Sequence, residues 1–409
     1  MSKRLRSTTQ NHNHDDDHDD NIPVDIQTEI IKRVQDVKPL IRCRSVSKAW
    51  KSLIDSSKFI ADHYKSNTNN HCMLVNYYEK KVNKYMASVV DDDDDDSFPR
   101  RNLPVALPES IDTSRLFNSE QGNLIGMCHG LFCFYGREEK VVDNSSSGKV
   151  AVIWNPSIRK SVAIPFPDKY HSLAAINFSV CPCTMHPKLV CIRPAENLAD
   201  IYTLSSSSGD NYWTSVSINL PNISHISFFS EWAAHKAALD EGILYWHVYN
   251  NFNDHGHRFN RIITFDLASE EFGEVCLPDC LATTDLGHVL YLSCKPNGSS
   301  LVVIARDTQA LYRVGKAVSH VWRMEEHGLF KQLYTIEAPG YYFVRGFRIN
   351  GQAIIANSTL KILQVYDPSN RQIKDLDFNH IGHRVFFMGC YRKTLLLLNH
   401  QSISSFIGD

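Results

Sequence analysis

The stretch VIWNPSIRKSVAIPFP, residues 152–167, decides the fold of this chain. Two runs of alternating apolar and polar residues flank Asn-Pro-Ser, a combination that favours a tight turn. We therefore predict two antiparallel strands joined by that turn. Four further stretches repeat the plan of an aromatic-bearing strand, a polar turn and a second strand. They occupy residues 201–221, 262–278, 320–339 and 363–378.

The aromatic residues of the five stretches recur at steps of 48, 63, 57 and 44 residues, and they are Trp154, Tyr202, Phe265, Trp322 and Tyr366. Each stretch has an upstream companion with a strand–turn–strand pattern. The companions lie at 124–136, 188–193, 236–249, 290–306 and 344–357. Two inner and two outer strands at this period are the size of one propeller blade.

A sixth companion, RVFFMGCYRKTLLLLN at 384–399, has no outer pair after it, and the strand-like residues 72–90 are free to supply one. A ring closed in this way leaves no open sheet edge to aggregate. We predict an all-β domain over residues 72–409, a six-bladed β-propeller with one composite blade. A β-sandwich of two packed sheets is the alternative for so many short strands.

Residues 22–64 carry a helical pattern, and the whole chain is therefore predicted to be an α+β multidomain protein. Pro23 suits a first helical turn, and Ser47 is placed to cap a later helix. The apolar residues at helical spacing are Ile26, Ile30, Ile31, Val34, Leu40, Cys43, Val46, Trp50, Leu53 and Ile54. Because three or four helices of this length form a very small core, part of this apolar surface is expected to meet another protein.

Two segments are too polar to contribute to a core. Residues 1–21 contain NHNHDDDHDD and are predicted to be a disordered acidic and histidine-rich tail. The six consecutive aspartates at 91–96 repel one another and are predicted to form a solvated loop.

Composition excludes several function classes. The net charge of −2 and the lack of a basic stripe disfavour nucleic-acid binding. No apolar run is long enough to span a bilayer, and the first residues have no hydrophobic signal segment. The 11 cysteines are scattered and odd in number, as expected for free thiols in a reducing compartment. We expect the protein in the cytoplasm, the nucleus or both.

We predict no catalytic residue, no metal and no cofactor, although a propeller enzyme remains an alternative. The group Cys181, Cys183, His186 and Cys191 fits no zinc-site spacing. A second group, His247, Asp254, His255 and His257, could coordinate a metal or act as acid and base. A polar insertion between strands is the preferred interpretation. The chain also lacks a nucleophile elbow, a P-loop and an H-E-x-x-H motif.

Residues 22–60, IPVDIQTEIIKRVQDVKPLIRCRSVSKAWKSLIDSSKFI, resemble the F-box. The family opens with Leu-Pro and continues to a Leu-x-Arg-x-x-x-Val-x-Lys-x-Trp stretch. This chain has those residues in order, as Leu40, Arg42, Val46, Lys48 and Trp50. It departs from the family in two places: Ile22 replaces the opening leucine, and the turn in VQDVKPL is one residue longer.

The remainder is similar to the plant F-box-associated domain. The matching phrases are GMCHGLFCF, VIWNPSIRK, LDEGILYW, FDLASEEFGEVCLP, VWRMEEHG and VYDPSNRQI, spread over residues 120–375. Kelch propellers share the blade phrase, but their usual Gly-Gly pair is missing here. The combined resemblance implies a non-catalytic substrate receptor of a Skp–cullin–F-box (SCF) ubiquitin ligase. In that role it recruits a protein target for ubiquitination and degradation, and a non-degradative scaffold is the alternative.

The resemblance also implies the partners and the residues that meet them. The helices would bind a Skp-type adaptor and, through it, the cullin-RING core. The implied adaptor-binding residues are Ile22, Pro23, Ile26, Ile30, Val34, Leu40, Arg42, Val46, Lys48, Trp50 and Ile54. No substrate-binding residue can be assigned, and the loops at 205–212 and 250–259 are named only as possible contacts.

Overall fold

A computed structural model describes the chain from Ile22 to His400, with gaps. The described residues are 22–67, 72–79, 84–92, 103–105, 107, 124–137, 149–166, 175–205, 212–228, 236–238, 241–251, 258–284, 288–294, 300–307, 309–325, 328–357, 362–376, 385–398 and 400. The predicted tail at 1–21 and residues 93–96 of the predicted acidic loop lie outside them.

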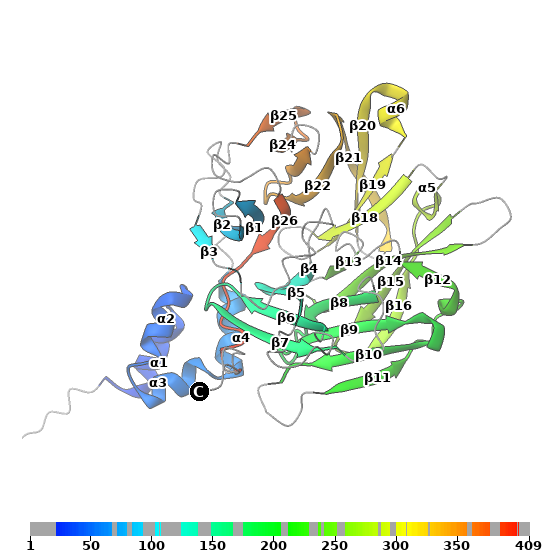
Figure 1. Ribbon diagram of the computed structural model, residues 1–409. Helices are drawn as coiled ribbons and strands as arrows, with labels where there is room; N and C mark the ends of the chain where they lie inside the picture. The colour runs from blue at the N-terminus through cyan, green and yellow to red at the C-terminus, as the bar shows by residue number, and fades with distance from the viewer. Residues whose placement is uncertain are drawn as a thin grey trace, which may run out of the picture.

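Four short helices come first and pack at one end of a ring of strands (Figure 1). They are α1 (Val24–Lys32), α2 (Val37–Cys43), α3 (Lys48–Ile54) and α4 (Ser57–Ser66). The predicted cap is confirmed, because the Ser47 hydroxyl accepts a hydrogen bond from the Trp50 amide at 3.1 Å. Ser56 caps α4 in the same way through the amide of Phe59.

The strands form six separate sheets of antiparallel strands, which confirms the predicted six-bladed propeller over the sandwich. The first complete blade contains β4 (Leu124–Cys128), β5 (Leu131–Arg137), β6 (Lys149–Asn155) and β7 (Lys160–Pro165). The second contains β8 (Ile176–Val180), β9 (Pro187–Arg193), β10 (Leu198–Thr203) and β11 (Trp213–Ser217). The short 3-10 helix η3 (Pro194–Glu196) joins β9 to β10, and η4 (Ile223–His225) follows β11.

The third blade has two extra short strands. It contains β12 (Ile226–Phe228), β13 (Lys236–Ala238), β14 (Ile243–Asn251), β15 (Arg258–Asp266), β16 (Glu271–Val275) and β17 (Thr283–Thr284), with helix α5 (Asp279–Ala282) before β17. The fourth contains β18 (His288–Cys294), β19 (Leu301–Asp307), β20 (Lys316–Met324) and β21 (Phe330–Pro339), with helix α6 (Ala310–Val314) between β19 and β20. The fifth contains β22 (Tyr342–Phe347), β23 (Ala353–Asn357), β24 (Ile362–Asp367) and β25 (Gln372–Asp375).

The sixth blade is composite, as predicted, but its division differs from the prediction. Its strand order is β26 (Val385–Tyr391), β1 (Cys72–Glu79), β2 (Lys84–Asp91) and β3 (Leu103–Val105). The C-terminal part therefore supplies one strand instead of two, and the N-terminal part supplies three. The four leucines at 395–398 form a buried turn in place of the expected second strand. This arrangement places the ring closure next to the helices.

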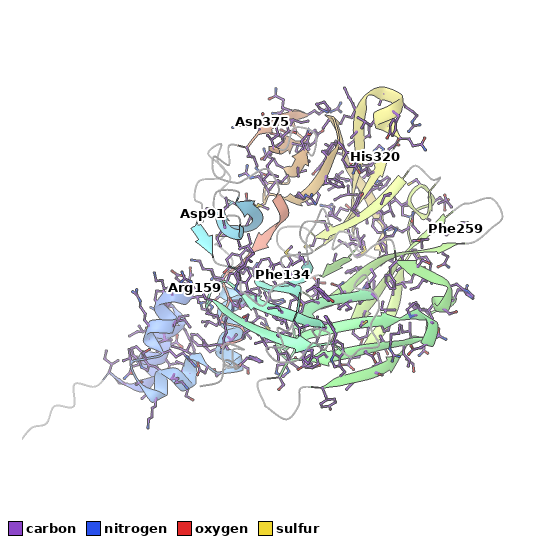
Figure 2. The ribbon with its side chains drawn as sticks, in the orientation of Figure 1. Asp91, Phe134, Arg159, Phe259, His320 and Asp375 are labelled. Carbon is purple, nitrogen blue, oxygen red and sulfur yellow. The ribbon has the colours of Figure 1, made fainter. Side chains whose placement is uncertain are left out.

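One turn recurs in three of the five repeated phrases. An Asn or Asp side chain at the end of the third strand accepts a hydrogen bond from the backbone amide two residues later. The residue four positions later has a left-handed backbone, which reverses the chain into the outer strand. The pairs are Asn155 with Arg159, Asp266 with Glu270, and Asp367 with Arg371. Figure 2 shows Arg159 at the edge of the ring that faces the helices.

Large side chains between adjacent blades hold the ring together. Trp154, Phe265 and Tyr366, three of the five recurring aromatic residues, are almost fully buried. Phe132 and Phe134 pack on Trp154, and Phe132 also contacts Tyr391 of the composite blade, with ring centroids 6.0 Å apart. These contacts join the first complete blade to the blade that closes the ring.

Asp92 corrects the prediction of a solvated loop over 91–96. Asp91 is the last residue of β2, and the Asp92 side chain is 2% exposed. A buried carboxylate needs charge and hydrogen-bond partners, and Arg348 and the amide of Ile349 provide them. Within the run of six aspartates, this one is therefore part of the core.

Candidate functional site

The first helix presents an apolar stripe to solvent. Ile26 and Ile30 are 53% and 50% exposed and lie four residues apart, hence along one side of the helix. Ile22, which is 52% exposed, lies two residues before the helix begins. Ile31, on the other side, is 1% exposed and packs into the core. A contiguous exposed apolar surface of this kind is typical of a binding site for another protein. Sequence reasoning found the three isoleucines but missed Val24, which is 66% exposed.

The residues predicted to bind an adaptor divide into three groups by exposure. Those open to solvent are Ile22, Pro23, Ile26, Ile30, Arg42, Val46 and Lys48. Those half-buried against the core are Val34 and Trp50. Those fully buried are Leu40 and Ile54. Only the first two groups are available at the surface.

Leu40 and Ile54 therefore require a correction. Both have 0% exposure and pack with Ile31, Val37 and Phe59 in the core of the helices. Their sequence spacing fits a docking surface and a core equally well, because both follow the same helical period. Their role in this structure is to hold the helices together behind the exposed stripe.

Trp50 joins the surface to the core. Its indole nitrogen donates a hydrogen bond to Gln27 Oε1 at 2.6 Å, which ties α3 to α1. Behind it, the Arg44 guanidinium forms a two-point ion pair with Asp55, from the end of α2 to the end of α3. These two contacts fix the angle at which α1 and α3 present their outer faces.

The turn that departs from the family pattern is firmly held. The carbonyl of Gln35 accepts hydrogen bonds from His63 Nε2 at 2.9 Å and from Asn67 Nδ2 at 3.2 Å, both at the end of α4. Burial lowers the pKa of His63, which favours the neutral ring in this position. Asp36, the next residue of the turn, pairs with Lys393 at 3.2 Å. The longer turn is thus fixed from two sides.

The segment from Arg392 to Leu398 connects the helices to the propeller. The guanidinium of Arg392 lies 4.8 Å from the ring centroid of Tyr64 in α4, and that ring stacks on His129 of the propeller. Leu395 to Leu398 are 1–8% exposed and belong to the same apolar cluster as the helix core. A short segment therefore buries apolar surface on both units at once.

Hydrogen bonds from the first complete blade hold this segment. The buried Asn155 amide donates to the carbonyls of Thr394 and Leu396 at 3.0 and 2.7 Å. Lys160 donates to the Leu398 carbonyl at 2.8 Å. Burial, reinforced by the nearby charge of Arg44, lowers the pKa of Lys160. Since the Asn155 side chain also forms the blade turn, one residue serves both the propeller and the attachment of the helices.

The two loops named as possible target contacts lie at opposite ends of the propeller. β10 ends beside Pro187, at the end where the helices pack, since His400 of the C-terminal segment also reaches Leu204 and Ser205. β14 ends at the other end of the ring, where α5 and α6 lie (Figure 1). Most of both loops, including Asp254, His255 and His257, lies outside the described residues. The described strand ends that flank the two loops are therefore at opposite ends of the propeller.

His247 is part of a blade core. It is 1% exposed, and its Nε2 lies 3.0 Å from Oδ1 of Asn260, whose amide donates to the Leu281 carbonyl. Burial lowers the pKa of His247 to about 4. Cys181 and Cys191 are also buried as free thiols, whereas Cys183 is exposed. Within the described ranges, no three or more His, Cys, Asp or Glu residues gather as a metal site.

Comparison with known proteins gives the family. Residues 107–401 match the model of the F-box associated beta propeller domain, and residues 20–62 match that of the F-box domain. The chain belongs to the F-box-associated β-propeller family. Its strands β1 to β3 lie before the region that this model matches, although they complete the ring.

Relatives of this F-box protein occur in Arabidopsis thaliana. "Putative F-box protein At1g47790" is 22% identical over 376 residues, which cover 89% of this chain and 87% of the relative. "F-box protein At5g18160" is 22% identical over 374 residues, covering 88% and 83%. Among solved structures, a chain of the nidogen/laminin complex overlaps 80% of this chain with a TM-score of 0.43 and 8% identity.

No helix among the residues that the structure describes is long and apolar enough to cross a bilayer.

Proposed function

We propose that this F-box protein is the substrate receptor of a Skp–cullin–F-box ubiquitin ligase. The observation that carries the proposal is the exposed apolar surface of Ile26 and Ile30 on α1, and of Ile22 just before it, in a segment that matches the F-box. Apolar side chains at this spacing fit a groove on a helical partner, with polar residues at the rim. Arg42 and Lys48, both exposed, would steer association with acidic groups of a Skp-type adaptor.

The receptor does no bond chemistry in this proposal. It holds a protein target on the propeller, in the cytoplasm or nucleus, and thereby raises the concentration of target lysines near a charged conjugating enzyme. The packed segment Arg392–Leu398 supports this proposal. A fixed angle between the helices and the propeller would keep the target in one place relative to the ligase core. His247, one of the four residues considered for metal binding or acid–base chemistry, is buried in a blade, with its Nε2 3.0 Å from Asn260 Oδ1.

A binding experiment tests the adaptor role. The full chain with Ile26→Asp and Ile30→Asp should lose at least tenfold of its affinity for a purified plant Skp-type adaptor. Leu329→Asp, which changes a residue 69% exposed on the propeller, is the matched control and should bind normally. Equal binding by the parent chain, the double variant and the control would rule out the proposed docking surface.

A second experiment separates a ligase receptor from a non-degradative scaffold. A target captured by the chain is incubated with the reconstituted cullin-RING complex, the conjugating enzyme and ubiquitin. Ubiquitin should be attached to the target only when the adaptor-binding surface is intact. A target that stays bound without gaining ubiquitin would favour the scaffold.

A further inference from the structure

At the end of the propeller opposite the helices, one buried arginine has an unfilled hydrogen-bonding position. Arg306, near the end of β19, is 3% exposed, and its Nη1 atom is buried without a hydrogen-bond partner. A buried donor without a hydrogen bond costs free energy of folding, and the cost is larger when the group is charged. Such an atom is expected where a bound group completes the site.

Two aromatic rings hold the guanidinium in place. The Cζ atom of Arg306 lies 3.8 Å from the ring centroid of Tyr341 and 4.7 Å from that of Phe343. The two rings pack edge to face, which fixes their mutual orientation. Cation–π contacts of this kind stabilise the charge of the guanidinium, but they satisfy none of the N–H donors that lie in the guanidinium plane. The guanidinium is therefore held in place while its Nη1 atom has no hydrogen-bond partner.

The nearby carboxylates are engaged elsewhere. Asp307 accepts hydrogen bonds from the amides of Gln309 and Ala310 at the start of α6, and it also pairs with Arg313. Glu337 pairs with Lys316 at 3.7 Å. No carboxylate of the described residues forms an ion pair with Arg306. A second cation, Arg345, also lies over the Phe343 ring, with its Cζ atom 5.1 Å from the ring centroid, and adds positive charge to the cluster.

One edge of the cluster is exposed at the surface of the propeller. Tyr341 is 41% exposed and follows β21. A backbone bridge joins Lys316, at the start of β20, to Gly340, so α6 lies close to Tyr341. Tyr312 on α6 is 90% exposed. β26 ends at Tyr391, beside the helices, and the innermost strands of a propeller run the same way. Tyr341, directly before the innermost strand β22, is therefore at the far end from the helices.

We propose that Arg306, Tyr341 and Phe343 form a site for an oxyanion, a carboxylate or phosphate group carried by the protein target. The inference rests on the proposed receptor function and names the chemistry that the propeller recognises. Arginine offers a planar fork of donors that matches either anion, and arginine and tyrosine are the residues that dominate many protein interfaces. The exposed Tyr341 edge would contact the residue that carries the anion.

The test uses the full chain with isotope-labelled arginine side chains and follows the Arg306 Nε–H signal by nuclear magnetic resonance. The probes are the peptides Gly-Gly-phosphoserine-Gly-Gly, Gly-Gly-Glu-Gly-Gly and Gly-Gly-Ser-Gly-Gly, each acetylated at the N-terminus and amidated at the C-terminus so that the side chain is the only anion. The phosphoserine or glutamate peptide should shift the signal in a saturable way, and the serine peptide should not. The stronger of the first two identifies phosphate or carboxylate as the source. An Arg306 signal unmoved by both anionic peptides would overturn the site.

Variants exclude a general charge effect. Arg306→Met should weaken binding of the anionic peptide at least tenfold, and Arg306→Lys should weaken it less. Arg313→Met removes an exposed arginine at the same end of the propeller and should leave binding unchanged. Equal loss in Arg306→Met and Arg313→Met would also overturn the site. If Arg306→Met unfolds the chain, Tyr341→Ala replaces it, with the same expected loss.

The two proposals fail independently. Arg306→Met should bind the purified adaptor as the parent chain does, because the helices lie at the other end. Loss of the peptide signal with normal adaptor binding would remove the anion site alone. A peptide signal in a chain that binds no adaptor would remove the receptor function and, with it, the assignment of the anion to a ligase target.

Discussion

Arg348 and Asp92 form a buried ion pair across the seam of the ring, with Arg348 Nε 2.9 Å from Asp92 Oδ1. Asp92 follows β2 of the composite blade, and Arg348 follows β22 of the blade beside it, 256 residues away. The second Asp92 oxygen accepts from the amide of Ile349, and Arg348 also donates to Gln352. The pair ties the N-terminal strands of the composite blade to the fifth blade, and so supports the seam at which β1 pairs with β26 to close the ring.

Asp92→Ala should therefore lower the stability of the propeller by about 3 kcal/mol, because it leaves a buried arginine without its counter-charge. Chemical denaturation of the parent chain and the variant, followed by tryptophan fluorescence, measures the change. Glu337→Ala breaks the exposed pair with Lys316 and is the control, expected to leave the unfolding midpoint unchanged. Equal midpoints for Asp92→Ala and the parent chain would show that the seam does not depend on this pair.

Within the F-box helices, Leu40 is a core residue and Ile30 is a surface residue. Leu40→Ala removes a fully buried side chain and should cost about 3 kcal/mol, from lost burial and the cavity left behind. Ile30→Ala changes a residue 50% exposed and should alter stability by less than about 0.5 kcal/mol. Hydrogen exchange of the helix amides measures both. A large loss of protection in Ile30→Ala would mean that the stripe belongs to the core.

The sequence predicted the blades because their determinants are local. The turn of Asn155 and Arg159 uses hydrogen bonds and a backbone conformation within five residues, and the phrase recurs wherever the turn does. The position of Asp92 is different. Its partner is 256 residues away, so a run of six aspartates gives no local sign that Asp92 is buried. Leu40 and Ile54 were assigned to the surface for a related reason, since a period locates a face but not what covers it.

His247 makes the third blade sensitive to acid. Its pKa is about 4 in the folded chain and 6.5 in an ordinary setting, so between these values only the unfolded chain binds the proton. Stability is then fully present above about pH 6.5 and falls as the pH drops towards 4. At about 1.4 kcal/mol per pH unit, the loss reaches about 3 kcal/mol at pH 4.

His247→Gln should reduce this dependence, because glutamine binds no proton in that range. Urea unfolding at several pH values between 4 and 7 compares the slope of the variant with that of the parent. Part of the slope should remain, since burial also lowers the pKa values of His63 and His400. Identical slopes would show that His247 is not neutral in the folded chain.

Gly130 tests whether the helices depend on the C-terminal segment. It has φ +73°, and a Cβ atom there would overlap the carbonyl oxygen of Arg392, the residue that covers Tyr64. Gly130→Ala should therefore displace Arg392–Leu398 and loosen α4 from the propeller. Gly315 has the same φ but nothing within 4 Å of its virtual Cβ, so Gly315→Ala carries the same backbone strain without the overlap. Limited proteolysis should cut Gly130→Ala after residue 391 well before the parent chain and Gly315→Ala. Equal cleavage of the two variants would mean that backbone strain alone accounts for the effect, and that the overlap with Arg392 is relieved without releasing the helices.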